Sequence, residues 1–149
     1  MFDTEYMAAA IAQAILAMDI DEVPVGAVIE YNGEIIAAAH NTRETDQNPL
    51  AHAEINAIRQ AAQALGSWRL LDCTLYVTLE PCPMCAGAIV NARIPRVVFG
   101  AYDPKAGAFG TLYDLSEGKL NHQPSVVGGI LEEECAQLLS GFFKSKRRK

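Results

Sequence analysis

Two short stretches of the sequence carry side chains that can bind a metal ion. They are His52-x-Glu54 and Cys82-x-x-Cys85. Histidine nitrogen and cysteine thiolate are common zinc ligands, and three protein ligands leave a fourth tetrahedral position open for water, as in catalytic zinc sites. The sequence therefore predicts a zinc site formed by His52, Cys82 and Cys85, with Glu54 beside it to move protons.

The Cys-x-x-Cys spacing has other interpretations, a redox pair or half of a structural zinc site. A redox pair would leave His52 and Glu54 unexplained. A closed structural site needs a fourth ligand, and Cys73 and Cys135 have no Cys-x-x-Cys partner. His52 alone would be read as a core histidine, and Glu54 alone as a helix-dipole partner. Only the combined pattern favours a catalytic zinc site.

The elements around these residues can place them together. Residues 74–80 alternate apolar and polar side chains, which predicts a strand. Residues 85–93 predict a helix after Pro81, so both cysteines lie at a strand-to-helix turn. There the positive helix end favours thiolate. Residues 51–65 predict a second helix, with His52 and Glu54 in its first turn.

The remaining sequence predicts further strands and helices in alternation, which indicates one layered α/β domain. A first helix is expected to be capped by Asp3 or Thr4. The last helix is expected at residues 131–144, and a basic tail follows it at residues 144–149. Strands are expected at 24–32 and 34–41, joined by a hairpin at Asn32-Gly33, and at 96–102 and 125–130. A long loop spans 103–124, with one helical turn at 111–116. The expected buried faces are Met7, Ile11, Ile15 and Met18 in the first helix, and Leu131, Cys135, Leu138, Leu139 and Phe142 in the last.

Composition limits the function classes. The 149 residues suit one domain with a substantial core, and the net charge is −6. Residues 1–42 contain no Lys or Arg, whereas the last six residues hold five basic ones. This acidic body argues against broad RNA binding and suggests a small RNA footprint, with the tail either solvated or binding phosphate. No apolar stretch is long enough for a membrane span, the N-terminus lacks a secretion signal, and Cys73 and Cys135 are expected to be buried free thiols. A cytoplasmic location is expected.

The combined pattern resembles the cytidine/deoxycytidylate deaminase superfamily, on His52-x-Glu54 and Pro81-Cys82-x-x-Cys85. The flanking sequence narrows the resemblance to the bacterial tRNA-specific adenosine deaminases. The similar segments are residues 23–28, 74–89, 92–112 and 128–143. The resemblance implies a three-layer α-β-α fold with a five-stranded mixed sheet, one Zn²⁺ per subunit and a homodimer. It also implies hydrolytic deamination of adenosine to inosine at the wobble position of an arginine tRNA, with Glu54 as the catalytic acid–base group. Pro104 and Phe109 depart from the family pattern in a loop outside the zinc chemistry.

The resemblance also implies residues that contact RNA. Asn41 is expected to bind the target nucleotide, although a turn-capping asparagine explains it equally well. The backbone at Pro24, Val25, Gly26 and Ala27 would line the base pocket, or serve only as a core strand. Asp103 and Lys105 would meet the anticodon loop. Phe143 is preferred to Phe142 for stacking, because Phe142 falls on the apolar face of its helix.

Two other functions remain open from the residues. A free nucleobase or nucleoside deaminase, for cytosine, cytidine or guanine, would use the same zinc chemistry, and the acidic body mildly favours it. The loop at residues 101–111 and the chain end at 142–149 instead suit a polymer substrate. A zinc-stabilised RNA-binding module without catalysis is the second alternative, and it would not need Glu54. His40 and His122 are expected to be structural or surface residues.

Overall fold

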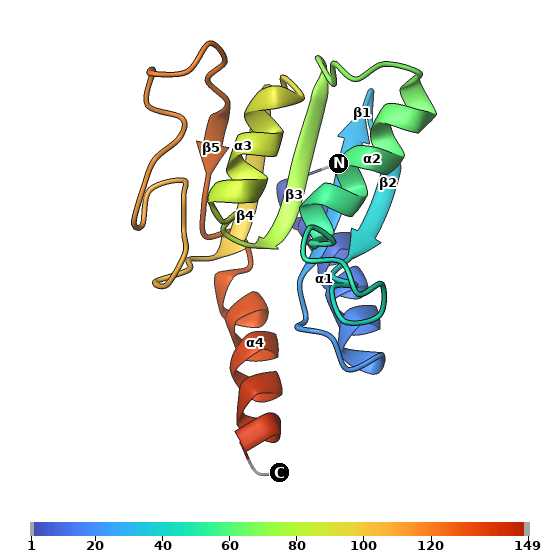
Figure 1. The fold of residues 1–149 in the computed structure, drawn as a ribbon, viewed down its shortest axis with the longest axis vertical. Coiled ribbons are helices and arrows are strands. Elements are labelled where there is room, and N and C mark those ends of the chain that lie inside the picture. The colour runs from blue at the N-terminus through green and yellow to red at the C-terminus, as the bar shows by residue number, and fades with distance from the viewer. Residues whose placement is uncertain (1, 148–149) are drawn as a thin grey trace.

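The computed structural model describes residues 2–147, which form a five-stranded sheet with helices on both faces (Figure 1). The strand order is β2-β1-β3-β4-β5, with β1 antiparallel to β2 and β3, and with β3, β4 and β5 parallel. The predicted five-stranded mixed sheet is confirmed. The elements are α1 (Asp3–Asp19), β1 (Gly26–Tyr31), β2 (Glu34–His40), α2 (Ala53–Leu65), β3 (Cys73–Leu79), α3 (Pro83–Asn91), β4 (Arg96–Ala101), β5 (Ser125–Val127) and α4 (Glu132–Arg147).

Each face of the sheet has its own apolar core, which confirms the three-layer architecture. On one face, α2 and α3 pack their alanines and Ile89 against alternate residues of the central strands, including Leu75, Val77 and Phe99. On the other face, α1 and the start of α4 pack against Val28, Tyr76 and Val98. Successive strand side chains point to opposite faces, so each central strand contributes to both cores. The sheet thus holds all four helices in place.

The hairpin turn and the end of α2 have the backbone conformations that their residues favour. Asn32 and Gly33 have positive φ angles of 52° and 83°, as a two-residue hairpin of the type I′ class needs. Gly66 ends α2 in the left-handed conformation at φ 63°. The hairpin at Asn32-Gly33 is confirmed, and so is the expected end of the helix at residue 65.

The predicted buried face of α1 is wrong in part. Ile15 is 40% exposed, and the buried positions are Tyr6, Met7 and three alanines, at 10, 14 and 17. The reason is the close approach of β1, since a Cβ atom at Gly26 would overlap the Ala10 carbonyl oxygen. Only small side chains fit between the helix and the sheet at that distance.

The N-terminal cap of α1 also differs from expectation. Phe2 is the N-cap residue, and no side chain caps the helix. Asp3 instead bonds to the Arg96 guanidinium at 2.9 and 2.7 Å and accepts a hydrogen bond from the Tyr76 hydroxyl. The Asp3 side chain therefore ties α1 to β3 and β4, and it is not available to the helix amides.

Two further expectations differ from the structure near the C-terminus. The turn of helix at residues 111–116 is absent, because Phe109 and Asp114 pair as an isolated bridge and Gly110 has a φ of 135°. Residues 144–147 of the expected tail form the last turn of α4. The rest of the tail, residues 148–149, lies outside the described residues. Figure 1 shows α4 extending well beyond the sheet, away from β5.

Candidate active site

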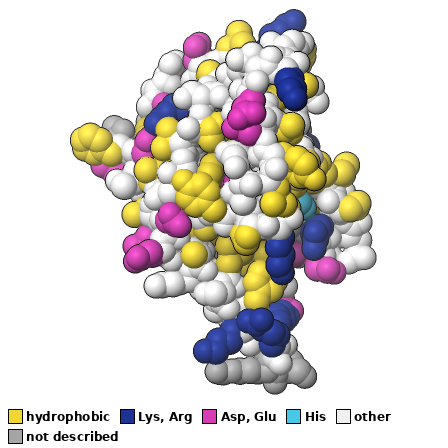
Figure 2. Space-filling view, turned by 90° about the vertical axis from the view of Figure 1, so that its left-hand side faces the viewer, with side chains coloured by type: hydrophobic (Ala, Val, Ile, Leu, Met, Phe, Trp, Pro, Cys, Tyr) yellow, Lys and Arg dark blue, Asp and Glu magenta, His cyan; other side chains and the backbone are white. Residues whose placement is uncertain are grey.

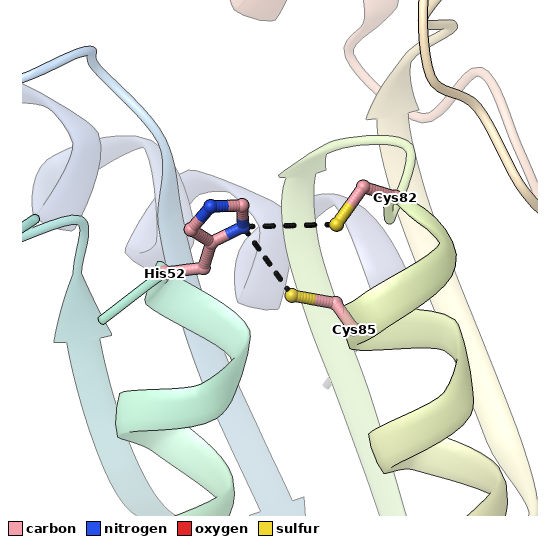
Figure 3. A group of neighbouring side chains, drawn as sticks. All are labelled: His52, Cys82 and Cys85. Carbon is pink, nitrogen blue, oxygen red and sulfur yellow. Dashed lines mark hydrogen bonds between the residues drawn. The ribbon is translucent and has the colours of Figure 1, made fainter. Parts of the chain in front are cut away.

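Two helix N-termini converge at the carboxyl end of β3. The helix α2 begins two residues later than expected, so His52 is its N-cap residue, and Cys82 is the N-cap residue of α3. Neither side chain caps its own helix. Their atoms therefore remain available to each other, and Figure 3 shows His52 facing both Cys82 and Cys85 across the gap between the two helices.

The separations of the three side chains match a tetrahedral metal site. His52 Nδ1 lies 3.7 Å from Cys82 Sγ and 3.5 Å from Cys85 Sγ. The three ligand atoms lie within 4.8 Å of one another. Zinc bonds of ~2.0 Å to nitrogen and ~2.3 Å to sulfur, at tetrahedral angles, put nitrogen and sulfur about 3.5 Å apart. The residues present therefore fit a zinc ion bound by one imidazole and two thiolates.

The electrostatics of the ligand group favour a thiolate at Cys82. A hydrogen bond from the Cys85 thiol, and a further one from His52, lower the pKa of Cys82 to about 4. The same hydrogen bond with Cys82 raises the pKa of His52. The pKa of Cys85 is raised, because its thiol donates a hydrogen bond to the Cys82 thiolate and because it is buried. One thiolate is thus stabilised before any cation binds, which suits a metal ligand.

Glu54 lies in the first turn of α2, beside the three ligand residues. Its side chain is only 4% exposed. Burial raises the pKa of Glu54 to about 7, because the ionised form loses its hydration. A carboxyl group with a pKa near neutrality can both accept and release a proton, which is the property of a general acid–base group.

A hollow of about 170 Å³ opens next to this group. His52, Glu54 and Cys82 line it, together with residues of the loops before β1, after β2 and after β4. The other lining residues are Val23, Val25, Asn41, Arg43, Ala53, Leu79, Glu80, Asp103 and Ala106. The hollow is largely apolar with a few polar groups, a composition typical of small-molecule sites.

The structure brings some of the expected RNA-contact residues to this hollow and leaves others away from it. Val25, Asn41 and Asp103 line it, whereas Pro24, Gly26 and Ala27 do not. The reason is that Gly26 faces α1 and Ala27 is paired in the sheet. Lys105 and Phe143 line a second hollow with Ser140, Lys146 and Arg147. Phe143 is 46% exposed, whereas Phe142 is buried, as the helix pattern predicted.

Asn41 has the turn-capping role that the sequence left open, and it also lines the hollow. Its Oδ1 atom accepts a hydrogen bond from the Arg43 amide at 3.1 Å, and its amide group donates to the Val23 carbonyl at 3.4 Å. These bonds hold the side chain in one orientation at the edge of the hollow. Asn41 therefore caps the turn and lines the hollow at the same time.

Sequence reasoning missed Arg43, Val23 and Glu80 as lining residues. Arg43 is the first Lys or Arg of the chain, and that position was an available signal. Val23 and Glu80 gave none, because an apolar residue and a glutamate beside a strand end are common. His40 and His122 have structural contacts, to Gln13 and to the Ile94 carbonyl, as expected. Cys73 and Cys135 are buried free thiols, which confirms that prediction.

This fold and this constellation of one histidine, two cysteines and a buried glutamate define a deaminase. The profile of the MafB19-like deaminase family matches residues 1–147. The chain belongs to that family, and within it to the tRNA-specific adenosine deaminases.

Three relatives illustrate the membership. The tRNA-specific adenosine deaminase of Bacillus subtilis (strain 168) is 58% identical over 148 residues, which cover 99% of this chain and 92% of the relative. A structure from a study of A-to-I editing by tRNA:A34 deaminases at the wobble position of transfer RNA superposes with a TM-score of 0.87. It is 45% identical and covers 91% of this chain and 99% of that one. A guanine deaminase from Bacillus subtilis is 29% identical with a TM-score of 0.66, covering 100% and 96% of the two chains.

None of the helices in the described part of the chain combines the length and the apolar character that crossing a bilayer requires.

Proposed function

We propose that this protein is a zinc-dependent hydrolase that converts adenosine to inosine at the wobble position of a tRNA, an arginine tRNA in particular. The observation that carries the proposal is the 58% identity, over 99% of the chain, to a tRNA-specific adenosine deaminase. The 148 matched residues span the pocket-forming loops as well as the metal-ligand motifs. The site geometry supports the same chemistry.

His52, Cys82 and Cys85 would hold the zinc ion. When bound, zinc lowers the pKa of water and so supplies a nucleophile near neutral pH. The hydrogen-bonded arrangement of the three side chains preorganises this ligand set. The N-terminal ends of α2 and α3 stabilise the thiolates, because their unpaired amides carry partial positive charge.

Glu54 would move the protons of the reaction. Its buried carboxylate first accepts a proton from the attacking water, and then delivers it to N1 of the adenine ring as C6 becomes tetrahedral. A second proton passes through the same group to the amine, which leaves as ammonia. A pKa near 7 lets one carboxyl group both take up and give up protons at neutral pH.

The hollow beside the metal ligands would receive the target base. Asn41 offers a fixed amide and Val25 an apolar surface, and both line it. A base stacked in a helix cannot reach such a depth, so the target nucleotide must be unpaired or flipped out. An anticodon loop meets this requirement at low energetic cost, because its bases are not paired.

The surroundings of the hollow suit a polymer substrate. A third hollow, between α4 and the loop after β2, shares Val23, Asn41 and Arg43 with the first. Lys146 lines both that hollow and the one with Lys105 and Phe143. Figure 2 shows Lys and Arg side chains gathered at the lower end of the molecule, where Figure 1 shows the last turns of α4. Phosphates flanking the target nucleotide would bind along this path.

The assembly and the location follow from the same proposal. We infer a homodimer in the cytoplasm, where tRNA is the substrate and thiols stay reduced. The described residues expose large apolar side chains that a second subunit would cover, among them Trp68, Leu71 and Tyr113. Sedimentation equilibrium tests the dimer directly, and a monomer across the micromolar range would contradict it.

The test is a deamination assay on an anticodon stem-loop with adenosine at the wobble position. Free adenosine, cytidine and guanine are assayed in parallel, and a stem-loop with guanosine at the same position is the control. Inosine formed only in the adenosine stem-loop supports the proposal. Turnover of a free base or nucleoside alone would retain the zinc chemistry and contradict the tRNA substrate.

Guanine is the second candidate substrate, because a guanine deaminase from Bacillus subtilis shares the fold over the full chain at 29% identity. The acidic composition is consistent with a small substrate. The same assay separates the two, since xanthine would form from free guanine.

A further inference from the structure

A buried carboxylate lies directly beside the candidate active site and has no role in the chemistry above. Glu80 follows the last residue of β3 and comes two residues before Cys82. It is 1% exposed, and among residues 2–147 no basic side chain forms an ion pair with it. A buried carboxylate is costly unless its oxygens accept hydrogen bonds, so the partners of Glu80 indicate its purpose.

Four hydrogen bonds to Glu80 come from a single loop, residues 103–111. Its Oε1 atom accepts from the Asp103 amide at 3.1 Å and from the Thr111 hydroxyl. Its Oε2 atom accepts from the amides of Phe109 and Thr111, both at 3.1 Å. The two ends of the loop therefore close on the same carboxylate, and each bond is strengthened by its charge.

The loop is shaped to pass over this carboxylate. A Cβ atom at Gly107 would overlap both oxygens of Glu80. The neighbouring amide of Ala108 donates to the Pro81 carbonyl at 2.9 Å. Only glycine permits such an approach of backbone to a carboxylate, so the middle of the loop is held as closely as its ends.

The same loop forms one side of the pocket. Asp103 and Ala106 line the hollow beside the metal ligands, and Lys105 lines the hollow next to Phe143. The Asp103 carboxylate accepts hydrogen bonds from the amides of Lys105 and Ala106, at 2.9 and 3.3 Å. The conformation that Glu80 holds therefore determines where these side chains stand.

We propose that Glu80 is a positioning residue whose buried carboxylate holds residues 103–111 as a preformed rim for the substrate nucleotide. It acts through Asp103 and Lys105 and does not touch the reacting atoms. The binding part of this proposal rests on the function proposed above, whereas the ordering of the loop does not. Preformed contacts strengthen binding because less conformational freedom is lost when the substrate arrives.

Glu22 provides a matched control that holds a different loop. It is also buried, and it accepts hydrogen bonds from the amides of Glu44 and Thr45 at 3.2 and 2.6 Å and from the Thr45 hydroxyl at 2.7 Å. Glu22 and Glu80 thus make the same kind of contact with different loops. Replacing either by glutamine keeps the side-chain volume and replaces one acceptor oxygen by a donor.

The experiment compares the zinc-loaded wild type with Glu80→Gln and Glu22→Gln by amide hydrogen exchange and by steady-state kinetics on the stem-loop. In Glu80→Gln we expect the rate of amide hydrogen exchange in residues 103–111 to rise about tenfold. We expect KM for the stem-loop to rise about tenfold as well, with kcat changed less than KM. Zinc content stays at the wild-type value. In Glu22→Gln, exchange rises in residues 43–48 and stays at the wild-type rate in residues 103–111.

Equal exchange of residues 103–111 in wild type and Glu80→Gln would overturn the proposal. Equal loosening of both loops in both variants would also overturn it, because that result reports a general loss of stability. Thr111→Val, which removes one of the four bonds at an exposed position, is expected to give a smaller increase in the same segment, and no increase would count against the proposal. If the wild type does not deaminate the stem-loop, the proposed function fails while the exchange result still decides the role of Glu80.

Discussion

The Nδ1 atom of His52 lies 3.5 Å from the Sγ atom of Cys85, although 33 positions separate the two residues in the chain. Each belongs to the start of a different helix, and the sheet fixes the distance between those helices. The ligand geometry is therefore a property of the whole domain. Metal binding should depend on His52 far more than on any other histidine.

Replacing His52 by alanine is expected to reduce zinc from about one ion per chain to near zero, because two thiolates alone do not complete the site. The zinc content after dialysis, measured by inductively coupled plasma mass spectrometry, checks this loss. His40→Ala is the control, since His40 bonds to Gln13 away from the thiolates. Zinc at wild-type levels in His52→Ala would remove this residue from the ligand set.

Glu54→Gln is expected to retain zinc and to lower turnover by about 10²–10⁴-fold, the usual contribution of a general acid–base group. The amide keeps the volume of the buried side chain but cannot carry protons. Single-turnover formation of inosine measures the effect without interference from product release. A rate within tenfold of the wild type would show that Glu54 is not the proton carrier.

The pH dependence of kcat/KM should show an acidic limb from Glu54. Burial raises the pKa of this carboxyl group to about 7, so the active carboxylate form is lost as the pH falls through that value. The positive charge of zinc favours the carboxylate and moves the limb to lower pH. Rates measured from about pH 4 to 8 test this, and a rate that rises as the pH falls would contradict it.

Gly26→Ala is expected to destabilise the fold by about 3 kcal/mol or more, because the new methyl group meets the backbone of α1 at Ala10. Urea denaturation gives the free energy of unfolding. Gly141→Ala in α4 is the matched control, since nothing lies within 4 Å of its Cβ position and alanine favours a helix by up to about 1 kcal/mol. Equal effects of the two substitutions would refute the close packing of α1 on β1.

Asp3→Asn is expected to lower the free energy of unfolding at neutral pH by about 1 kcal/mol, a modest value because the pair with Arg96 is partly exposed. The hydrogen bonds from the Arg96 guanidinium hold the pKa of Asp3 below its usual value. The contribution of Asp3 is therefore complete above its unfolded pKa of about 4 and is lost as the pH falls through its folded pKa.

Denaturation of wild type and Asp3→Asn at pH 7 and at pH 3 measures this difference, which should shrink at the lower pH. A difference that grows as the pH falls would mean that Asp3 is destabilising when ionised, contrary to its contacts with Arg96 and Tyr76.

Residue types and local spacing alone predicted a metal site in this protein. A histidine and two cysteines three positions apart are ligand types that zinc prefers, and the fold brings these three side chains together. The hairpin at Asn32-Gly33 and the end of α2 at Gly66 were equally local, because backbone conformation at those positions depends on the residue itself. The central strands followed from their apolar alternation in the same way.

Tertiary structure alone decided that Arg43 and Glu80 line the pocket and which face of α1 is buried. Ile15 is exposed and Ala10 is buried because Gly26, sixteen positions after Ala10, brings β1 against the helix. Glu80 binds the loop at residues 103–111, and Arg43 reaches the hollow, through contacts between segments far apart in the sequence. Such contacts depend on distances between packed elements, which no local pattern of residues encodes.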